Sequence, residues 1–257
     1  MSYQISEQNL ERQKLLSVAL NKISKKYLKR FPKEPIQKVL DLACGLGETS
    51  RMHKGLFPHA EVVGVDMDEK LLDYAKELGE EGIQFKQGDA TGLPFPDDHF
   101  DLVFTRFLLI HVPDPVAVLK EMKRVCKQGG ILLIQEPDMA ISGGLYPSHW
   151  AFDLLTDAYH KLYADTHIGR KLPRLFEQVG LPTPQVRCDT FLMHRHQQGI
   201  SKTLTRMTAE AILDNMIEQG VISSEKAPDF ISSLKEIEED PAYSYLTDPV
   251  VTIWTKL

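Results

Sequence analysis

The chain has 257 residues, of which 42% are apolar and 26% are charged, as expected for a globular protein that buries a sizeable core. Its 30 basic and 36 acidic side chains give a net charge of −6, so it lacks the basic surface typical of nucleic-acid-binding proteins. The three cysteines lie far apart and form no CxxC pair. This spacing indicates neither a zinc site nor a disulfide framework, and we expect no metal.

The amino-terminal segment predicts a helix over residues 7–30, because Leu16, Leu20, Ile23 and Tyr27 fall on one face of a helix. The first residues are polar and contain no apolar leader segment. No apolar run approaches the roughly 20 residues of a membrane span. We therefore expect a cytoplasmic protein that does not enter a membrane.

From residue 36 the chain alternates between strand and helix patterns. Short apolar runs predict strands at residues 38–42, 61–65, 83–87, 100–105 and 130–135. The stretches between them are long enough for helices at residues 47–57, 69–79 and 114–127. Apolar strands separated by helices indicate a parallel sheet that is covered on both faces.

The regular alternation of strand and helix patterns ends after Pro137. Helical patterns follow at residues 148–163, 172–181, 201–219 and 225–239, with strand patterns at 184–193 and 248–257. We therefore predict a doubly wound, mostly parallel Rossmann-like α/β sheet of seven strands, with helices on both faces and a helical lid. The whole chain is interpreted as one domain with five parts: a helical cap at 1–35, a cofactor-binding core at 36–138, lid insertions at 139–170 and 200–245, and remaining core elements at 171–199 and 246–257.

A glycine turn follows the first predicted strand in "KVLDLACGLGETS". Gly45 and Gly47 allow a ligand to approach the backbone, and the next helix offers free N–H groups. Ser50 stands where a dinucleotide-binding GxGxxG motif has its third glycine, so a nicotinamide-dependent oxidoreductase remains an alternative.

Acidic residues lie at or just beyond the carboxyl ends of the first three predicted strands. Asp41 lies where a structural strand would carry an apolar residue, and a carboxylate there can bind a ligand ammonium group. Asp66, 21 positions after Gly45, can accept both hydroxyls of a ribose, and Asp89 can accept from an adenine amine. Together these positions suit an adenosine with an amino-acid tail and no pyrophosphate.

Four stretches carry a family resemblance. "VLDLACGLGETS", "VVGVDMD", "QGDATGLPFPDDHFDLVFTRFLLIHVPDP" and "LKEMKRVCKQGGILLIQEPD" resemble, in order and spacing, the motifs of class I S-adenosylmethionine-dependent methyltransferases. The resemblance covers about residues 36–138 and is nearest to small-molecule enzymes with an amino-terminal helical cap. It departs at Ala43, where the family usually has glycine.

The resemblance implies S-adenosyl-L-methionine as cofactor and assigns residues to it. Asp41, Gly45 and Gly47 would line the methionine portion. Asp66 would bind the ribose and Met67 would pack on the adenine. Asp89 and Ala90 would contact the adenine amine and ring. Arg106 would approach the ligand carboxylate or the acceptor.

The acceptor is not specified by any motif. We expect a small or mid-sized metabolite rather than a nucleic acid, with the enzyme a monomer or a homodimer. His111 and His149 are the candidate bases, each weighed against a structural role, and the catalytic residue is left open. A non-catalytic S-adenosylmethionine-binding protein is the second alternative.

Overall fold

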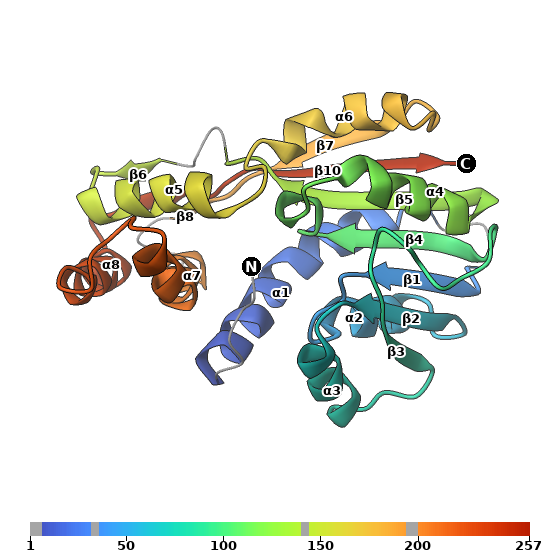
Figure 1. The fold of residues 1–257 in the computed structure, drawn as a ribbon, viewed down its shortest axis with the longest axis horizontal. Helices are drawn as coiled ribbons and strands as arrows, with labels where there is room; N and C mark the ends of the chain where they lie inside the picture. The colour runs from blue at the N-terminus through green and yellow to red at the C-terminus, as the bar shows by residue number, and fades with distance from the viewer. Residues whose placement is uncertain (1–6, 32–35, 140–143, 194–199) are drawn as a thin grey trace.

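The computed structural model describes residues 7–31, 36–139, 144–193 and 200–257. Among these residues, seven strands form the central sheet, in the order β3-β2-β1-β4-β5-β10-β7 (Figure 1). The strands are β1 (Lys38–Leu42), β2 (Glu61–Asp66), β3 (Ile83–Gln87), β4 (Phe100–Arg106), β5 (Cys126–Pro137), β7 (Gln185–Asp189) and β10 (Val250–Lys256). The neighbours from β3 to β5 pair in parallel, whereas β10 is antiparallel to both β5 and β7. The predicted doubly wound, mostly parallel sheet is confirmed.

Helices cover both faces of this sheet, as Figure 1 shows. They are α1 (Glu7–Leu28), α2 (Glu48–Leu56), α3 (Glu69–Glu77), α4 (Pro115–Val125) and α6 (Ile168–Gln178). On one face, Leu119 of α4 and Phe176 of α6 are fully buried against strand residues. On the other, Tyr27 of α1 and Met52 of α2 pack with a second set of strand side chains. Two apolar cores thus hold the strand ends in fixed register.

An outer helical unit lies beyond the carboxyl ends of the parallel strands (Figure 1). It comprises α5 (Trp150–Leu162), α7 (Ile200–Glu218), α8 (Ala227–Glu239) and a small antiparallel sheet of β6 (Leu145–Tyr146), β9 (Ser244–Leu246) and β8 (Leu192–Met193). Its own core includes Phe152, Ile212 and Phe230. α7 also contacts α1, which joins this unit to the cap helix.

Two predicted strands differ from the structure by more than two residues at one end or both. The run 184–193 was predicted as one strand, but the structure divides it between β7 of the central sheet and β8 of the small sheet. The fifth strand is longer than the predicted 130–135, because β5 extends to Pro137 and begins at Cys126. None of the described helices is long and apolar enough to cross a bilayer.

Candidate active site

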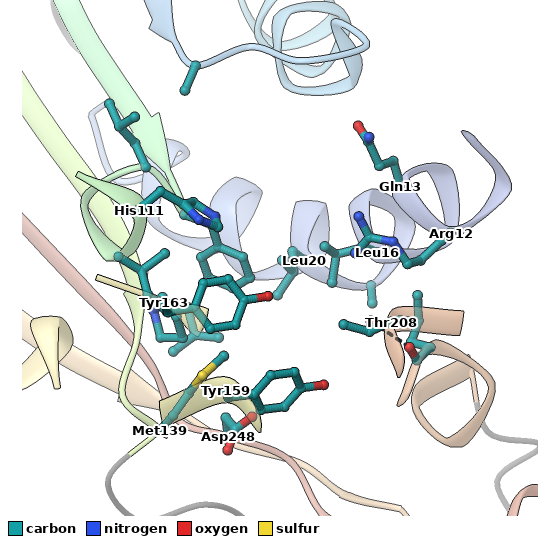
Figure 2. A pocket seen from close by; sticks show the side chains of 18 of the residues that line it. Arg12, Gln13, Leu16, Leu20, His111, Met139, Tyr159, Tyr163, Thr208 and Asp248 are labelled. Atoms are coloured by element: carbon teal, nitrogen blue, oxygen red, sulfur yellow. Dashed lines mark hydrogen bonds between the residues drawn. The ribbon is translucent and has the colours of Figure 1, made fainter. Parts of the chain in front are cut away.

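Two adjoining cavities open at the carboxyl ends of β1, β2 and β4. The main cavity has a volume of about 1860 Å³ and lies between these strand ends, α1 and the outer helical unit. Figure 2 shows Leu16 and Arg12 of α1 on one side of it and Tyr159 and Tyr163 on the other. The second, which we call the turn cavity, has about 110 Å³ and lies at the glycine turn. Residues such as Gln13 line both cavities, so the two lie next to each other.

The glycine turn adopts left-handed backbone conformations at three positions. Ala43 has φ of 59°, Gly45 of 52° and Gly47 of 78°. Gly45 lines the turn cavity, but Gly47 lines neither cavity. A Cβ at Gly47 would lie 2.6 Å from the Cζ of Phe85, so this glycine allows the turn to pack against β3. Ala43 occupies a conformation that costs a non-glycine residue about 1–2 kcal/mol.

Asp41 is buried beneath the turn and lines neither cavity. Its Oδ2 accepts hydrogen bonds from the hydroxyls of Thr49 at 2.7 Å and Ser50 at 2.6 Å, both on the first turn of α2. Burial raises the pKa of Asp41 to about 6, and the two hydroxyl donors oppose this rise. In this structure Asp41 therefore ties the end of β1 to the start of α2.

Four predicted cofactor residues line the main cavity together: Asp66, Met67, Asp89 and Ala90. The Asp66 carboxylate accepts from the Gly45 amide at 2.8 Å and the Asp68 amide at 3.0 Å, which holds the glycine turn against the end of β2. Burial raises the pKa of Asp66. Met67 leaves 76% of its surface exposed, an unusual amount for an apolar side chain.

The Asp89 carboxylate is fixed by the residue that follows it in the turn. Its Oδ1 accepts from the amide and from the hydroxyl of Thr91, each at 2.8 Å. These two bonds lower the pKa of Asp89. The side chain is therefore a charged acceptor at the tip of β3, on the wall of the main cavity.

Arg106 ends β4 and reaches the turn cavity. Its guanidinium donates to the side-chain oxygens of Asn21 at 2.9 Å and of Ser24 and Ser17 at 3.3 Å, all on α1. Within the described residues it forms no ion pair. Burial lowers the pKa of Arg106 to about 10, against the opposing charges of Asp41 and Glu48. The turn cavity is thus bounded by a partly buried cation whose hydrogen-bond partners are uncharged.

The two candidate histidines lie in different places. His111, in the short 3₁₀ helix Leu109–His111, lines the main cavity, and its ring packs edge-on against Tyr163 with centroids 5.1 Å apart. Burial lowers the pKa of His111 to about 4, so its imidazole is neutral near pH 7. His149 lines neither cavity. Its ring accepts from the Ala151 amide at 3.2 Å and caps α5.

Glu136 is a site residue that the sequence analysis did not identify. This fully buried carboxylate accepts from the amides of Leu108 at 2.9 Å, Leu109 at 2.7 Å and Ile110 at 3.3 Å. Burial raises its pKa to about 8, and the three amide donors oppose the rise. The bonded loop places Leu108, Ile110 and His111 on the main cavity. The sequence carried one signal that could have identified Glu136, which is an acid at the end of the apolar run in "LLIQEP".

The strand order with its antiparallel β10, the glycine turn and the acids at the ends of β2 and β3 define a class of protein: a class I S-adenosylmethionine-dependent methyltransferase. The described residues contain no group of three or more His, Cys, Asp or Glu side chains that would hold a metal ion.

Comparison with known proteins identifies the same class. The family model described as "Methyltransferase domain" matches residues 40–134. An uncharacterized methyltransferase of Schizosaccharomyces pombe is 36% identical over 146 residues, covering 53% of this chain and 52% of that protein. The chain therefore spans about half the length of that relative. The demethylmenaquinone methyltransferase of Staphylococcus aureus (strain JH9) is 33% identical over 173 residues, covering 60% of this chain and 71% of that protein.

The fold has solved counterparts as well. A Bacillus halodurans C-125 structure assigned as a methyltransferase superimposes with a TM-score of 0.60 and 22% identity, covering 90% of this chain and 96% of that one. The chain belongs to the class I S-adenosylmethionine-dependent methyltransferase family. It is therefore an enzyme with S-adenosylmethionine as its cofactor, and the nicotinamide alternative is not supported.

Proposed function

We propose that the protein transfers a methyl group to a small or mid-sized metabolite held in the main cavity. Bound S-adenosylmethionine supplies an electrophilic methyl group on a sulfonium centre. A lone pair of the acceptor forms the new bond to this carbon while the sulfur–carbon bond breaks, its electron pair stays on sulfur, and any proton on the acceptor atom passes to water. The protein's residues contribute positioning and exclusion of water.

The observation that carries the proposal is the partly buried Arg106 at the turn cavity, whose guanidinium forms no ion pair within the described residues. A buried charge is costly unless an opposite charge pairs with it, and the side chains that bond this guanidinium are neutral. An amino-acid carboxylate entering beside Gly45 would supply the missing partner. Asp41, whose charge lies near Arg106, lies beneath the turn and lines neither cavity, so our proposal that it binds the ammonium group requires the turn to shift when the ligand enters.

The adenosine end fits the main cavity next to this position. We assign the ribose hydroxyls to Asp66, since a carboxylate that already accepts two amides retains further acceptor sites. Met67 presents an exposed apolar surface suited to an adenine face. Asp89 and Ala90 stand where the adenine amine and ring would lie.

A pair of ligands tests the two ends separately. S-adenosylhomocysteine carries the amino-acid end, whereas 5′-methylthioadenosine has the adenosine without it. Calorimetry of Arg106→Gln should show weaker S-adenosylhomocysteine binding and unchanged 5′-methylthioadenosine binding, and Asp66→Ala should weaken both. Equal losses for both ligands in Arg106→Gln would place the guanidinium away from the carboxylate. Titration with NAD serves as the negative control.

We also propose that the amino-terminal helix, predicted at residues 7–30, and the segment 140–170 act as a lid over the cofactor. The described parts of both contribute to the main cavity wall, and the second follows the carboxyl end of β5. Hydrogen exchange in residues 7–30 and 140–170 should slow when S-adenosylhomocysteine is added. Protection confined to the residues around Gly45, Asp66 and Asp89 would reject the lid. Cytoplasmic location and a monomeric or homodimeric state remain predictions.

A further inference from the structure

The main cavity is larger than one ligand requires. Pockets for single small molecules measure about 300–1000 Å³, and this cavity has about 1860 Å³. The residues assigned to the cofactor occupy the end formed by β2 and β3. The rest, which we call the acceptor chamber, lies between α1 and residues of α5, α7, β8 and β9. The side chains that line the acceptor chamber indicate which kind of acceptor it can bind. This inference rests on the proposed methyl transfer.

One wall of the acceptor chamber is a row of aromatic rings. His111 packs against Tyr163 with centroids 5.1 Å apart, and Tyr163 packs against Tyr159 with centroids 5.6 Å apart. Figure 2 shows this row on one side of the cavity, with Leu16 and Leu20 of α1 also on the lining. A slot between rings and leucines favours a flat apolar molecule, because aromatic faces and edges gain contact area with little loss of entropy.

Three threonines on the chamber wall, Thr190, Thr208 and Thr247, add little polarity. Thr208 donates to the Leu204 carbonyl at 2.7 Å, and Thr190 donates to the Thr247 carbonyl at 2.8 Å. The Thr247 hydroxyl accepts from the Phe191 amide at 3.0 Å. Since these hydroxyls are engaged with the backbone, they offer a sugar or a nucleotide fewer hydrogen bonds than their number suggests.

The charges on the chamber wall also argue against a cationic acceptor. Asp248 is the carboxylate on the chamber side of the described lining, whereas Arg12 and Lys22 of α1 contribute positive charges. A cationic amine acceptor would need more carboxylates than positively charged side chains on the chamber wall. His111, at the inner end of the ring row, is neutral near pH 7 and can exchange a hydrogen bond with an uncharged polar group.

We propose that the acceptor is an uncharged, mid-sized molecule built on a flat aromatic ring with a hydroxyl group, bound between the His111–Tyr163–Tyr159 row and α1. The ring lies against the two tyrosines, and the hydroxyl lies toward His111 and the cofactor end. This places Tyr159 and Tyr163 as determinants of acceptor specificity.

Fluorescence titration with 2-naphthol, in the presence of saturating S-adenosylhomocysteine, tests this assignment. Tyr163→Ala should weaken 2-naphthol binding about tenfold or more, as loss of an aromatic contact predicts. Tyr163→Phe should stay within about threefold of the parent protein, since it keeps the ring. Trp150→Ala is the matched control, because it removes a half-exposed ring that lines neither cavity, at the start of the helix α5 that Tyr163 caps.

Glucose and spermidine, which represent polyols and amines, should not compete with 2-naphthol. Competition by either one, or equal 2-naphthol affinity in Tyr163→Ala and the parent protein, overturns the assignment. Calorimetry of S-adenosylhomocysteine with the same variants separates the two proposals. Cofactor binding without naphthol binding rejects the aromatic acceptor alone, whereas absence of cofactor binding rejects the proposed function itself.

Discussion

Replacing Glu136 by glutamine should loosen the loop that follows β4. The carboxylate accepts three backbone amides, two on Oε1 and one on Oε2. Glutamine has the same shape, and its carbonyl oxygen can keep Leu108 and Leu109. Its NH₂ group must then face the Ile110 amide, which leaves a buried donor unpaired. A buried amide left without an acceptor costs about 1–3 kcal/mol, so we expect the free energy of unfolding to fall by about 2 kcal/mol.

Urea denaturation measures this loss, and steady-state turnover measures its effect on the site. Because the loop places His111 and its neighbours on the main cavity, kcat should fall in addition to stability. Glu121→Gln is the matched control: this carboxylate also accepts a backbone amide and pairs with Arg124, but lines neither cavity. It should lose stability with kcat unchanged. A Glu136→Gln protein with parental stability and kcat would refute the reasoning.

Three further changes test other parts of the structure. Asp66→Ala should weaken S-adenosylmethionine binding by about 1.5–3 kcal/mol in calorimetry, and unchanged affinity in a folded variant would remove Asp66 from the site. His53 is buried with neither ring nitrogen bonded, and burial lowers its pKa from 6.5 to about 3. The contribution of His53 to the free energy of unfolding is therefore fully present above pH 6.5 and should be about 2 kcal/mol smaller at pH 5 than at pH 7. In urea titrations at the two pH values, His53→Phe should change the stability difference between pH 5 and pH 7 by about this amount relative to the parent protein. Ala43→Gly relieves a left-handed alanine and should raise the free energy of unfolding by about 0.5–1 kcal/mol, whereas a lower value would show that no strain is stored there.

The central sheet was predictable because its strands are apolar runs bounded by turn residues. β1 and β3 have the predicted limits, and β2 and β4 extend one residue further. The small sheet was not predictable, since β6 and β8 have two residues each and carry no periodic pattern. Their pairing with β9 depends on contacts between distant parts of the chain.

Residue type and spacing could not separate the roles of similar site residues. Gly45 and Gly47 occur in one motif, yet Gly45 lines the turn cavity and Gly47 accommodates the Phe85 ring. Asp66 and Glu136 both end apolar strands and accept backbone amides of a neighbouring loop, but Asp66 lines the main cavity and Glu136 lines neither cavity. Such differences depend on the direction in which a side chain leaves its strand, which only the packed sheet defines.

One helix connects the two halves of the site. Ser17, Asn21 and Ser24 repeat at four and three residues, so they share the face of α1 that binds Arg106. Leu16 and Leu20 lie one position before two of these residues and line the main cavity. Any shift of α1 along or around its axis must therefore change the guanidinium's partners and the acceptor wall together. If a ligand carboxylate pairs with Arg106 as proposed, it would also fix the leucine wall, and we therefore propose that cofactor binding prepares the acceptor chamber through α1.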